Sequence, residues 1–468
     1  MKKQVLVLFT VFFIGVANAQ EKTLQLSLNE AIDYALENSY NTKAAKNDIK
    51  TAKEIVWQTT AVGLPQVNAS VDYQNFLKQP VSLLPAAAFD NRASVVETVE
   101  EFFDINRETS PEAADGFIPV IFGTKQNVNA SVTLTQLLFD GSYLVGLQAS
   151  KTFLKISKQA EEKTELVTRE AVINAYGNVL VTEKSIEILT GNIQILEKNY
   201  RDAQKIYENG FNEQEDVEQL EITLGNVKNQ LRSARRMKEI AFQMLNISLG
   251  NPNKTKLMLT DSLDGLAEKN INMALIGAEF NFSEHIDFRI SENDRETKRL
   301  MMKLEQSKYL PSLSAFVNYG RQGFSDSFSF LNGSQEWFNS SLLGISLNVP
   351  IFSSFSRRAK TAQAKIALET ADLRLEETKQ RLSLQAKKAK SAYQLSIENY
   401  QTSKRNAGLA ERIEKKQRIK FFEGISSSFD LLQAQNQLYA QQQNYIQSML
   451  TIIAAKATLE NALNLPIK

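Results

Sequence analysis

The sequence contains no cysteine, a single histidine and only nine prolines in 468 residues. Without cysteine, the chain has no disulfide bond, no thiolate metal ligand, no cysteine nucleophile and no N-terminal cysteine for lipid attachment. His285 has no cysteine or second histidine with which to share a metal ion, so we expect no metal site. No proline lies between Pro119 and Pro252, or between Pro350 and Pro466. Because proline interrupts helices, these two stretches favour long helices.

An excess of charge of one sign is also missing, because 54 lysines and arginines nearly balance 53 aspartates and glutamates. This balance gives no reason to expect nucleic acid as a partner. No nucleophile–base pairing, phosphate-binding loop or metal-ligand cluster is visible, so the sequence indicates neither an enzyme nor a protein with a cofactor. After the first twenty residues, no segment has the uninterrupted apolar length that a membrane-spanning helix needs.

The first 19 residues have the pattern of a cleavable secretory signal. Two lysines precede the apolar run Val5–Val16, and the small residues of Ala17–Ala19 follow it directly. The run is short for a membrane helix. We therefore expect residues 1–19 to be a signal peptide and the mature chain to begin near Gln20.

Short matches between distant segments indicate an internal duplication. The matched blocks are 64–73 with 310–319, 138–140 with 351–353, Gly210 and Asp216 with Gly424 and Asp430, and 249–252 with 463–466. The last three pairs have nearly constant spacing, which predicts a long rigid element between them. We predict two copies of one structural unit, at residues 20–252 and 253–468.

The first pair of blocks is farther apart than the others, which places an insertion within residues 74–127 of the first copy. This insertion contains four prolines, and its eight acidic residues outnumber its four basic ones. We predict an acidic surface loop, and the larger of the two loops at the cell surface.

Four segments alternate between apolar and polar residues, as strands with unlike faces do. We expect strands near residues 67–73, 127–135, 313–319 and 345–351. Such alternation is typical of a transmembrane barrel strand but also of a soluble sandwich. Aromatic residues between the last two strands favour the barrel, because aromatic girdles flank its apolar band; they are Phe324, Phe328, Phe330, Trp337 and Phe338.

Four strands cannot close a barrel, and an open sheet edge is not viable in lipid. The protein must therefore oligomerise, and a dimer, trimer or tetramer would have eight, twelve or sixteen strands. Because a barrel of about eight strands is filled by its own side chains, a trimer is the smallest assembly with an open lumen.

The remaining sequence predicts helices at 142–208, 213–249, 355–422 and 429–463, and an earlier one that starts at the capping box Ser27–Glu30 and runs to about Val62. Apolar residues on the first long helix alternate at spacings of three and four, as in a coiled-coil seam. They are Ile186, Leu189, Ile193, Leu196, Tyr200, Ala203 and Tyr207, and the returning helix matches them with Val217, Leu220, Leu224, Val227, Leu231 and Ala234. In the second copy, Leu431, Ala434 and Leu438 are in phase with Val217, Leu220 and Leu224.

The chain as a whole resembles the TolC-like outer membrane factor family. The resemblance rests on the signal peptide, the duplicated halves, the Leu-Pro openings at Pro65 and Pro311, and a glycine followed six residues later by aspartate at each hairpin tip. It implies a mixed α and β membrane protein, a homotrimer with four strands per protomer in a twelve-stranded β-barrel, continuous with a periplasmic α-helical coiled-coil tunnel. It also implies an outer-membrane exit duct for efflux or type I secretion, surrounded by outer-membrane lipid and served by a periplasmic adaptor and an inner-membrane pump.

The resemblance places a closable entrance and an adaptor-docking surface at the hairpin tips. The entrance residues it implies are Asp216, Asp430, Gln219, Gln433, Tyr207 and Phe421, and the docking residues are Gly210, Phe211, Gly424, Ile425 and Ser426. The chain departs from some members at two places, where Gln433 replaces a second acid and Ser426 replaces an arginine. The resemblance therefore does not carry over a salt-bridge latch.

Three simpler interpretations accompany these hypotheses. Asp216 and Asp430 also fit helix N-terminal carboxylates favoured by the helix dipole. The charged run between Glu411 and Lys420 is typical of a solvated helix face. A structural or adhesive coiled-coil protein of the envelope would share the heptads, but it has no need of four strands patterned for lipid.

Overall fold

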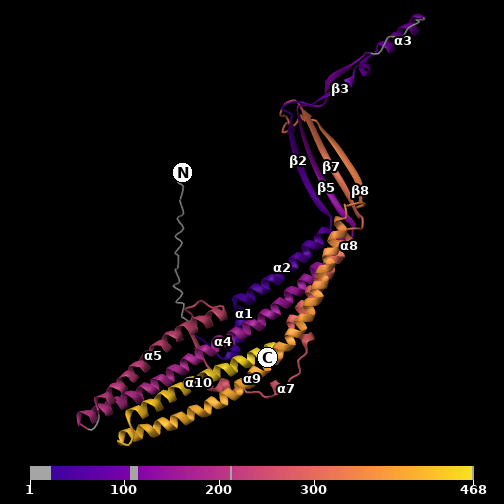
Figure 1. The fold of residues 1–468 in the computed structure, drawn as a ribbon. Helices are drawn as coiled ribbons and strands as arrows, with labels where there is room; N and C mark the ends of the chain where they lie inside the picture. Colours follow the sequence, from indigo (N-terminus) through magenta and orange to yellow (C-terminus); the bar gives the residue numbers. More distant parts are fainter. Residues whose placement is uncertain (1–22, 106–113, 211–212, 466–468) are drawn as a thin grey trace, which may run out of the picture. The chain divides into compact units, whose positions relative to one another are not determined.

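The computed structural model describes residues 23–105, 114–210 and 213–465. The predicted signal peptide and Phe211 lie outside these residues. The chain divides into two compact units, which we call the helical unit and the strand unit (Figure 1). The helical unit comprises Met1–Val56, Ala149–Met302 and Ala362–Lys468, and the strand unit comprises Trp57–Gln148 and Lys303–Thr361.

Long helices dominate the chain, as the sequence predicts. They are α4 (Gly141–Glu208), α5 (Gln214–Leu249), α8 (Ile286–Ser307), α9 (Ser356–Phe422) and α10 (Ser428–Ala462). Four of these agree within one residue with the predicted helices. Within the described part of the chain, no helix combines the length and the apolar character needed to cross a membrane.

The predicted helix from Ser27 to Val62 is wrong in one respect, because it is two helices. These are α1 (Leu28–Asn38) and α2 (Tyr40–Val62), and Ser39 between them has an extended ψ of 149°. The hydroxyl of Ser39 accepts a hydrogen bond from the backbone N–H of Thr42 (3.2 Å), so it caps α2. The end of α5 also reaches this break, since a Cβ on Gly250 would stand 2.3 Å from the carbonyl oxygen of Asn38.

The main core of the helical unit contains three buried tyrosines, Tyr176, Tyr393 and Tyr400, and the first two bind the short elements beside it. A short parallel pair, β1 (Leu24–Leu26) with β6 (Leu257–Leu259), and three short helices, α6 (Leu263–Lys269), α7 (Ala274–Gly277) and η2 (Phe282–Glu284), complete this region. The hydroxyl of Tyr176 donates to the carbonyl of Leu26 (3.1 Å), and the hydroxyl of Tyr393 donates to the carbonyl of Asn270 (2.6 Å). These two bonds tie the short elements to the long helices α4 and α9.

The predicted coiled-coil seams are confirmed over most of their length. Buried residues of α4 and α5 form one apolar cluster of Ile193, Leu196, Leu224, Val227 and Leu231. Nearer the tips, a second cluster, which we call the tip core, joins α4, α5, α9 and α10 through Ala203, Leu220, Phe421 and Leu431. The tips of the two hairpins therefore pack against each other.

The strand unit contains one four-stranded antiparallel sheet in the order β2-β5-β7-β8 (Figure 1). Its strands are β2 (Gln66–Asn75), β5 (Gln126–Asp140), β7 (Ser312–Ser325) and β8 (Trp337–Asn348). The last strand begins earlier than predicted and ends before Val349 and Ile351. Pro350 explains the end, because proline has no N–H to donate to the ladder.

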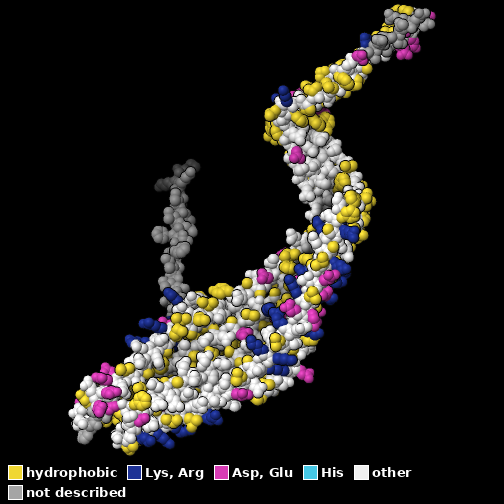
Figure 2. Space-filling view, viewed as in Figure 1, with side chains coloured by type: hydrophobic (Ala, Val, Ile, Leu, Met, Phe, Trp, Pro, Cys, Tyr) yellow, Lys and Arg dark blue, Asp and Glu magenta, His cyan; other side chains and the backbone are white. Residues whose placement is uncertain are grey.

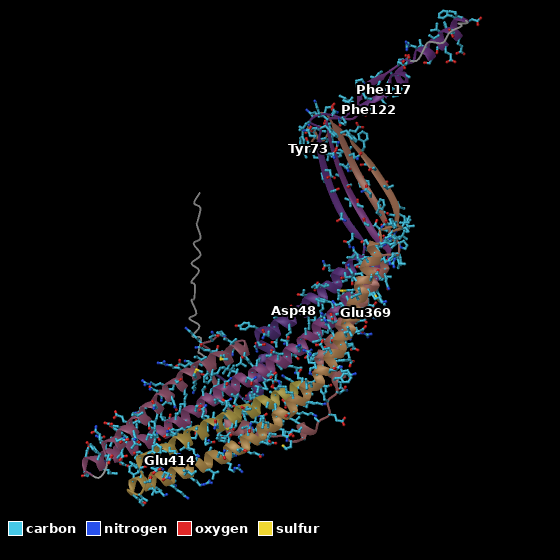
Figure 3. The ribbon with its side chains drawn as sticks, viewed as in Figure 1. Asp48, Tyr73, Phe117, Phe122, Glu369 and Glu414 are labelled. Carbon is cyan, nitrogen blue, oxygen red and sulfur yellow. The ribbon has the colours of Figure 1, made fainter. Side chains whose placement is uncertain are left out.

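The insertion at residues 74–127 is more ordered than the surface loop that we predicted. It contains a ribbon of β3 (Val81–Pro85) and β4 (Phe117–Ile121), and the segment between these two strands contains η1 (Ala86–Phe89) and α3 (Arg92–Phe103). The ten residues of β3 and β4 include no charged side chain, so the acidic character belongs to the rest of the insertion. Figure 3 labels Phe117 and Phe122 in this exposed apolar segment.

Candidate functional site: the sheet faces and the hairpin tips

The cross-strand register sorts the side chains of the sheet into two unlike faces. One row of neighbouring residues crosses all four strands on the same face of the sheet and consists of Val67, Leu134, Val317 and Leu343. Since side chains alternate along a strand, the intervening residues share the other face. The predicted alternation is thus in phase across all four strands, and the sheet has one mainly apolar face.

The other face is mainly polar and is linked by hydrogen bonds between side chains. The hydroxyls of Ser70 and Ser131 lie 3.1 Å apart, and the amide of Asn318 donates to the hydroxyl of Thr133 (2.7 Å). A hollow of about 300 Å³ opens on this face near the loop end, lined by Asp72, Gln74, Asn127, Val128, Asn129, Gln322 and Phe324. Charged side chains are sparse over the sheet and frequent over the helices (Figure 2).

Both outer strands of this sheet have an unpaired edge. β2 pairs only with β5, and β8 pairs only with β7, among the described residues. A row of free backbone N–H and C=O groups is therefore available on each side.

The predicted aromatic girdle is only partly correct. Trp337 shares the apolar face with Val67, whereas Phe324 and Phe338 share the polar face with Asn127 and Gln322. Both strands extend beyond their predicted bounds and include these residues. The alternation of side chains along β7 and β8 therefore determines which face each ring is on. The two loop rings, Phe328 and Phe330, make edge contacts with Tyr73 of the apolar face, with ring centroids 5.9 and 6.1 Å apart. Figure 3 labels Tyr73 at this end of the sheet.

Phe316 is a residue of the polar face that the alternation pattern does not single out. It stands opposite Gly344, and a Cβ on this glycine would lie 2.4 Å from the Phe316 ring. The ring therefore covers the glycine on the neighbouring strand. An aromatic residue opposite a glycine is the sequence signal, but it becomes visible only when the register is known.

The hairpin tips begin with glycines in the left-handed region, as expected. Gly210 has φ +79° and Gly424 has φ +73°. After α9, the N–H of Ile425 donates to the carbonyl of Lys420 (2.8 Å), and that of Gly424 donates to the carbonyl of Phe421 (3.0 Å). This is a Schellman motif, which satisfies the last carbonyls of the helix.

Asp216 and Asp430, which the sequence presents as equivalents, are in different environments. Asp430 forms a capping box with Ser427 at the start of α10. In α5 the N-cap residue is Glu213, whose side chain makes no cap hydrogen bond. No described residue hydrogen-bonds or pairs with the carboxylate of Asp216. Both aspartates thus lie in the first turn of a helix, as the simpler interpretation expects, but only Asp430 makes a capping hydrogen bond.

The other predicted entrance and docking residues also differ from one another in exposure. Tyr207 is 41% exposed, but its counterpart Phe421 is only 6% exposed and belongs to the tip core, so Phe421 does not line a surface. Gln219 donates to the carboxylate of Glu215 (3.0 Å). Gln433 is exposed, and so are the docking residues Gly424 and Ile425, while Ser426 is half-buried.

Glu414 is the exception to the solvated charge run. It lies in α9 near the tips (Figure 3) and is 5% exposed, although Glu411 three residues earlier is exposed. Burial raises the pKa of the Glu414 carboxyl, while nearby Arg418 (3.9 Å) lowers it. A carboxylate inside the tip region was not predicted, because a helix with charges on every face gives no sign of which one is buried.

His285 has a structural environment. It is buried, its Nδ1 accepts the backbone N–H of Asp287 (3.1 Å), and burial lowers its pKa. No group of three or more potential metal ligands occurs among the described residues. Its ring also makes an edge contact with Phe280.

Comparison with known proteins relates this geometry to a family. The model of the outer membrane efflux protein family matches residues 105–251 and 284–465, which include α4, α5, β5, β7, β8, α9 and α10. No individually curated relative matches the sequence. Among solved structures, the chain is similar in fold to the outer membrane protein VceC of Vibrio cholerae, at 15% identity and a TM-score of 0.67, over 93% of this chain and 95% of that chain.

Two further structures support the same fold. CusC has 15% identity and a TM-score of 0.70, over 95% of this chain and 94% of that chain. The CmeC outer membrane channel of Campylobacter jejuni has 17% identity and a TM-score of 0.67, over 93% and 85%. The mixed α and β fold is thus shared over more than nine-tenths of this chain. Because the family model matches both long-helix hairpins and three strands of the sheet, the chain belongs to the outer membrane efflux protein family.

Proposed function

We propose that this chain is the outer-membrane exit duct of a tripartite efflux or type I secretion system. It is a passive channel for substrates that an inner-membrane pump delivers through a periplasmic adaptor. One observation carries the proposal: the β2-β5-β7-β8 sheet has an apolar face, a polar face and two unpaired edges. In lipid, unpaired backbone groups are not tolerated, so other copies must close this sheet.

The strand directions support closure by a homotrimer. Each neighbouring pair is antiparallel, so β2 and β8 run in opposite directions. β8 of one copy can therefore pair with β2 of the next in the same antiparallel manner. Three copies give a twelve-stranded barrel with an open lumen, whereas about eight strands would be filled by side chains. The polar face would line the lumen and the apolar face would meet lipid.

Exposed apolar stripes on the helical unit also support an assembly. Met237, Ile240, Met244 and Ile247 of α5 are each at least half exposed, at spacings of three and four. On α9, the exposed residues Ile366, Leu373, Leu384 and Leu395 are spaced by seven or eleven residues, which places them on one line of the helix. Contact with neighbouring copies would remove both stripes from water.

We further propose that the chain is a duplication of residues 20–252 and 253–468, with the helical unit in the periplasm and the hairpin tips at its entrance. The repeated order of helix, two strands and a long-helix hairpin supports this division. Gly210, Phe211, Gly424, Ile425 and Ser426 would meet the adaptor, and Asp216 would face the entrance.

Heat-resistant oligomers and channel activity test the proposal together. Full-length protein extracted from outer membranes should run as a trimer without boiling and should conduct ions in a planar bilayer. A structural or adhesive coiled-coil protein would give oligomers without conductance. Monomers that conduct no ions, in extracts where a known porin is active, would contradict the proposal.

A further inference from the structure

One charged residue stands on the apolar face of the sheet. The four strands contain only three charged side chains, Asp72, Asp140 and Arg321. Asp72 stands opposite Asn129 on the polar face, and Asp140 accepts the backbone N–H of Ser142 (2.7 Å) at the end of β5. Arg321 shares a row with Val71, Ala130 and Asn339, so it is the one charged residue of these strands on the apolar face.

The surroundings of Arg321 supply hydrogen-bond donors and no carboxylate. Arg321 stands opposite Asn339, and in the next row of the same face Tyr319 stands opposite Ser341. All four side chains are exposed. Arg321 forms no salt bridge with a described residue. A guanidinium, an amide and two hydroxyls therefore occupy two neighbouring rows of this face, and no acidic residue of the four strands shares it.

The Arg321 guanidinium lies over the ring of Trp337. The Arg321 Cζ lies 5.8 Å from the centre of the Trp337 ring, in a cation–π contact. The ring is itself held against the strand, because a Cβ on Gly323 would lie 3.3 Å from it, and Phe330 packs beside it with centroids 6.4 Å apart. Arginine stacked on an indole keeps its planar fork free for a further ligand.

The position along the strand explains why an arginine is tolerated there. An arginine facing lipid destabilises a barrel by about 2–4 kcal/mol at the bilayer midplane but by only about 0–1 kcal/mol near the interface. From Leu313 to Arg321, a strand tilted by about 40° climbs roughly 20 Å, close to the apolar band of about 25 Å. Arg321 thus lies at the outer edge of the band, one row of this face before Tyr73 and Trp337.

We propose that Arg321, together with Asn339, Tyr319 and Ser341, binds the phosphate of an anionic lipid headgroup in the outer leaflet. Arginine matches phosphate oxygens with two parallel N–H donors, and the neighbouring amide and hydroxyls can bind the remaining oxygen. The inference rests on the proposed function, because that function makes this face the lipid-facing one.

Lipid retention by purified trimers tests the site. Delipidated full-length protein in detergent is titrated with lipid A that carries both phosphates, and bound lipid is counted by native mass spectrometry. Removing one charge-assisted donor pair should weaken binding roughly tenfold in Arg321→Gln. The affinity of Arg321→Lys for lipid A should lie between those of Arg321→Gln and the parent, since lysine keeps the positive charge but lacks the two parallel donors of arginine. The control Arg381→Gln changes an exposed arginine of α9 and should bind like the parent.

The outcomes separate this inference from the channel itself. Equal binding by Arg321→Gln and the parent would overturn it, as would equally tight binding of lipid A stripped of its phosphates. Displacement of the lipid by millimolar inorganic phosphate would also overturn it, because the site would then take a free anion. Conductance is recorded for the parent in the same preparation, so a failed channel is distinguishable from a failed lipid site. If Arg321→Gln forms no trimers, the comparison of Arg321→Lys with the parent decides.

Discussion

The carboxylate of Asp430 and the side chain of Ser427 cap each other at the start of α10. The backbone N–H and the hydroxyl of Ser427 donate to the carboxylate (3.2 and 2.8 Å), and the N–H of Asp430 donates to the hydroxyl (3.2 Å). Asp216 has no such arrangement in α5. Asp430 therefore caps a helix, whereas the carboxylate of Asp216 has no hydrogen-bond partner among the described residues.

We predict that Asp216→Asn lowers cation selectivity and that Asp430→Asn does not. Three free carboxylates converging in a trimer would attract cations to the narrow end of the channel. Reversal potentials in a salt gradient measure the effect for each single variant. Asp430→Ala should instead destabilise the hairpin by about 1 kcal/mol, through loss of the cap. An unchanged reversal potential in Asp216→Asn would show that this carboxylate does not face the conduction path.

Valine at Gly210 or Gly424 should impair export while trimers persist. Both glycines have positive φ, and a Cβ at either would meet no described atom within 4 Å beyond its chain neighbours, so the expected strain lies in the backbone. A non-glycine residue there costs about 1–2 kcal/mol and should shift the turn. Substrate export and adaptor pull-down measure the outcome, and Gly191→Val, at a glycine of α4 with open space and no positive φ, is the matched control. Normal export by the double valine variant would exclude these turns from docking.

Glu414→Gln should stabilise the hairpin tips at neutral pH. Burial raises the pKa of the folded-state carboxyl above its unfolded value of about 4.3. The stabilising contribution of the protonated form is therefore fully present when the pH is below the unfolded-state pKa. It is lost as the pH rises through the raised folded-state pKa. Relative to the parent, the variant should gain on the order of 1 kcal/mol at pH 7 and little at pH 4.

Thermal unfolding followed by circular dichroism at both pH values measures this gain. Glu411→Gln is the control, because Glu411 lies in the same helix and is exposed. The explanation is wrong if Glu414→Gln changes the melting temperature equally at pH 4 and pH 7.

Arginine at neighbouring positions of β7 should distinguish the two faces of the sheet. Val317 lies in the middle of the apolar face, and Asn318 lies on the polar face. Val317→Arg should destabilise the barrel by about 2–4 kcal/mol and lower the yield of heat-resistant trimers, as for charge at the bilayer midplane. Asn318→Arg should leave trimers intact and change conductance, since its side chain would enter the lumen. The reverse result would show that the faces are assigned the wrong way round.

The sequence alone predicted the elements well, because their signals are local and periodic. Spacings of three and four residues located the seam that buries Leu196 and Leu224, and proline-free stretches predicted α4 and α9 almost to the residue. Alternation identified all four strands of the sheet, and the glycines at 210 and 424 predicted the turns. Each of these features depends on the geometry of a single helix, strand or turn.

Only the tertiary structure decided which side chain of a matched pair is available for function. Tyr207 is exposed while Phe421 is buried, because the tip core is formed by α4, α5, α9 and α10 together. The register of β7 against β5 and β8 determines which face Phe324 is on and that Arg321 has no acidic residue opposite it. A register shift of one residue would exchange the two faces. Sequence periodicity determines which residues share a side of one element, but burial and charge pairing depend on which other elements lie against that side.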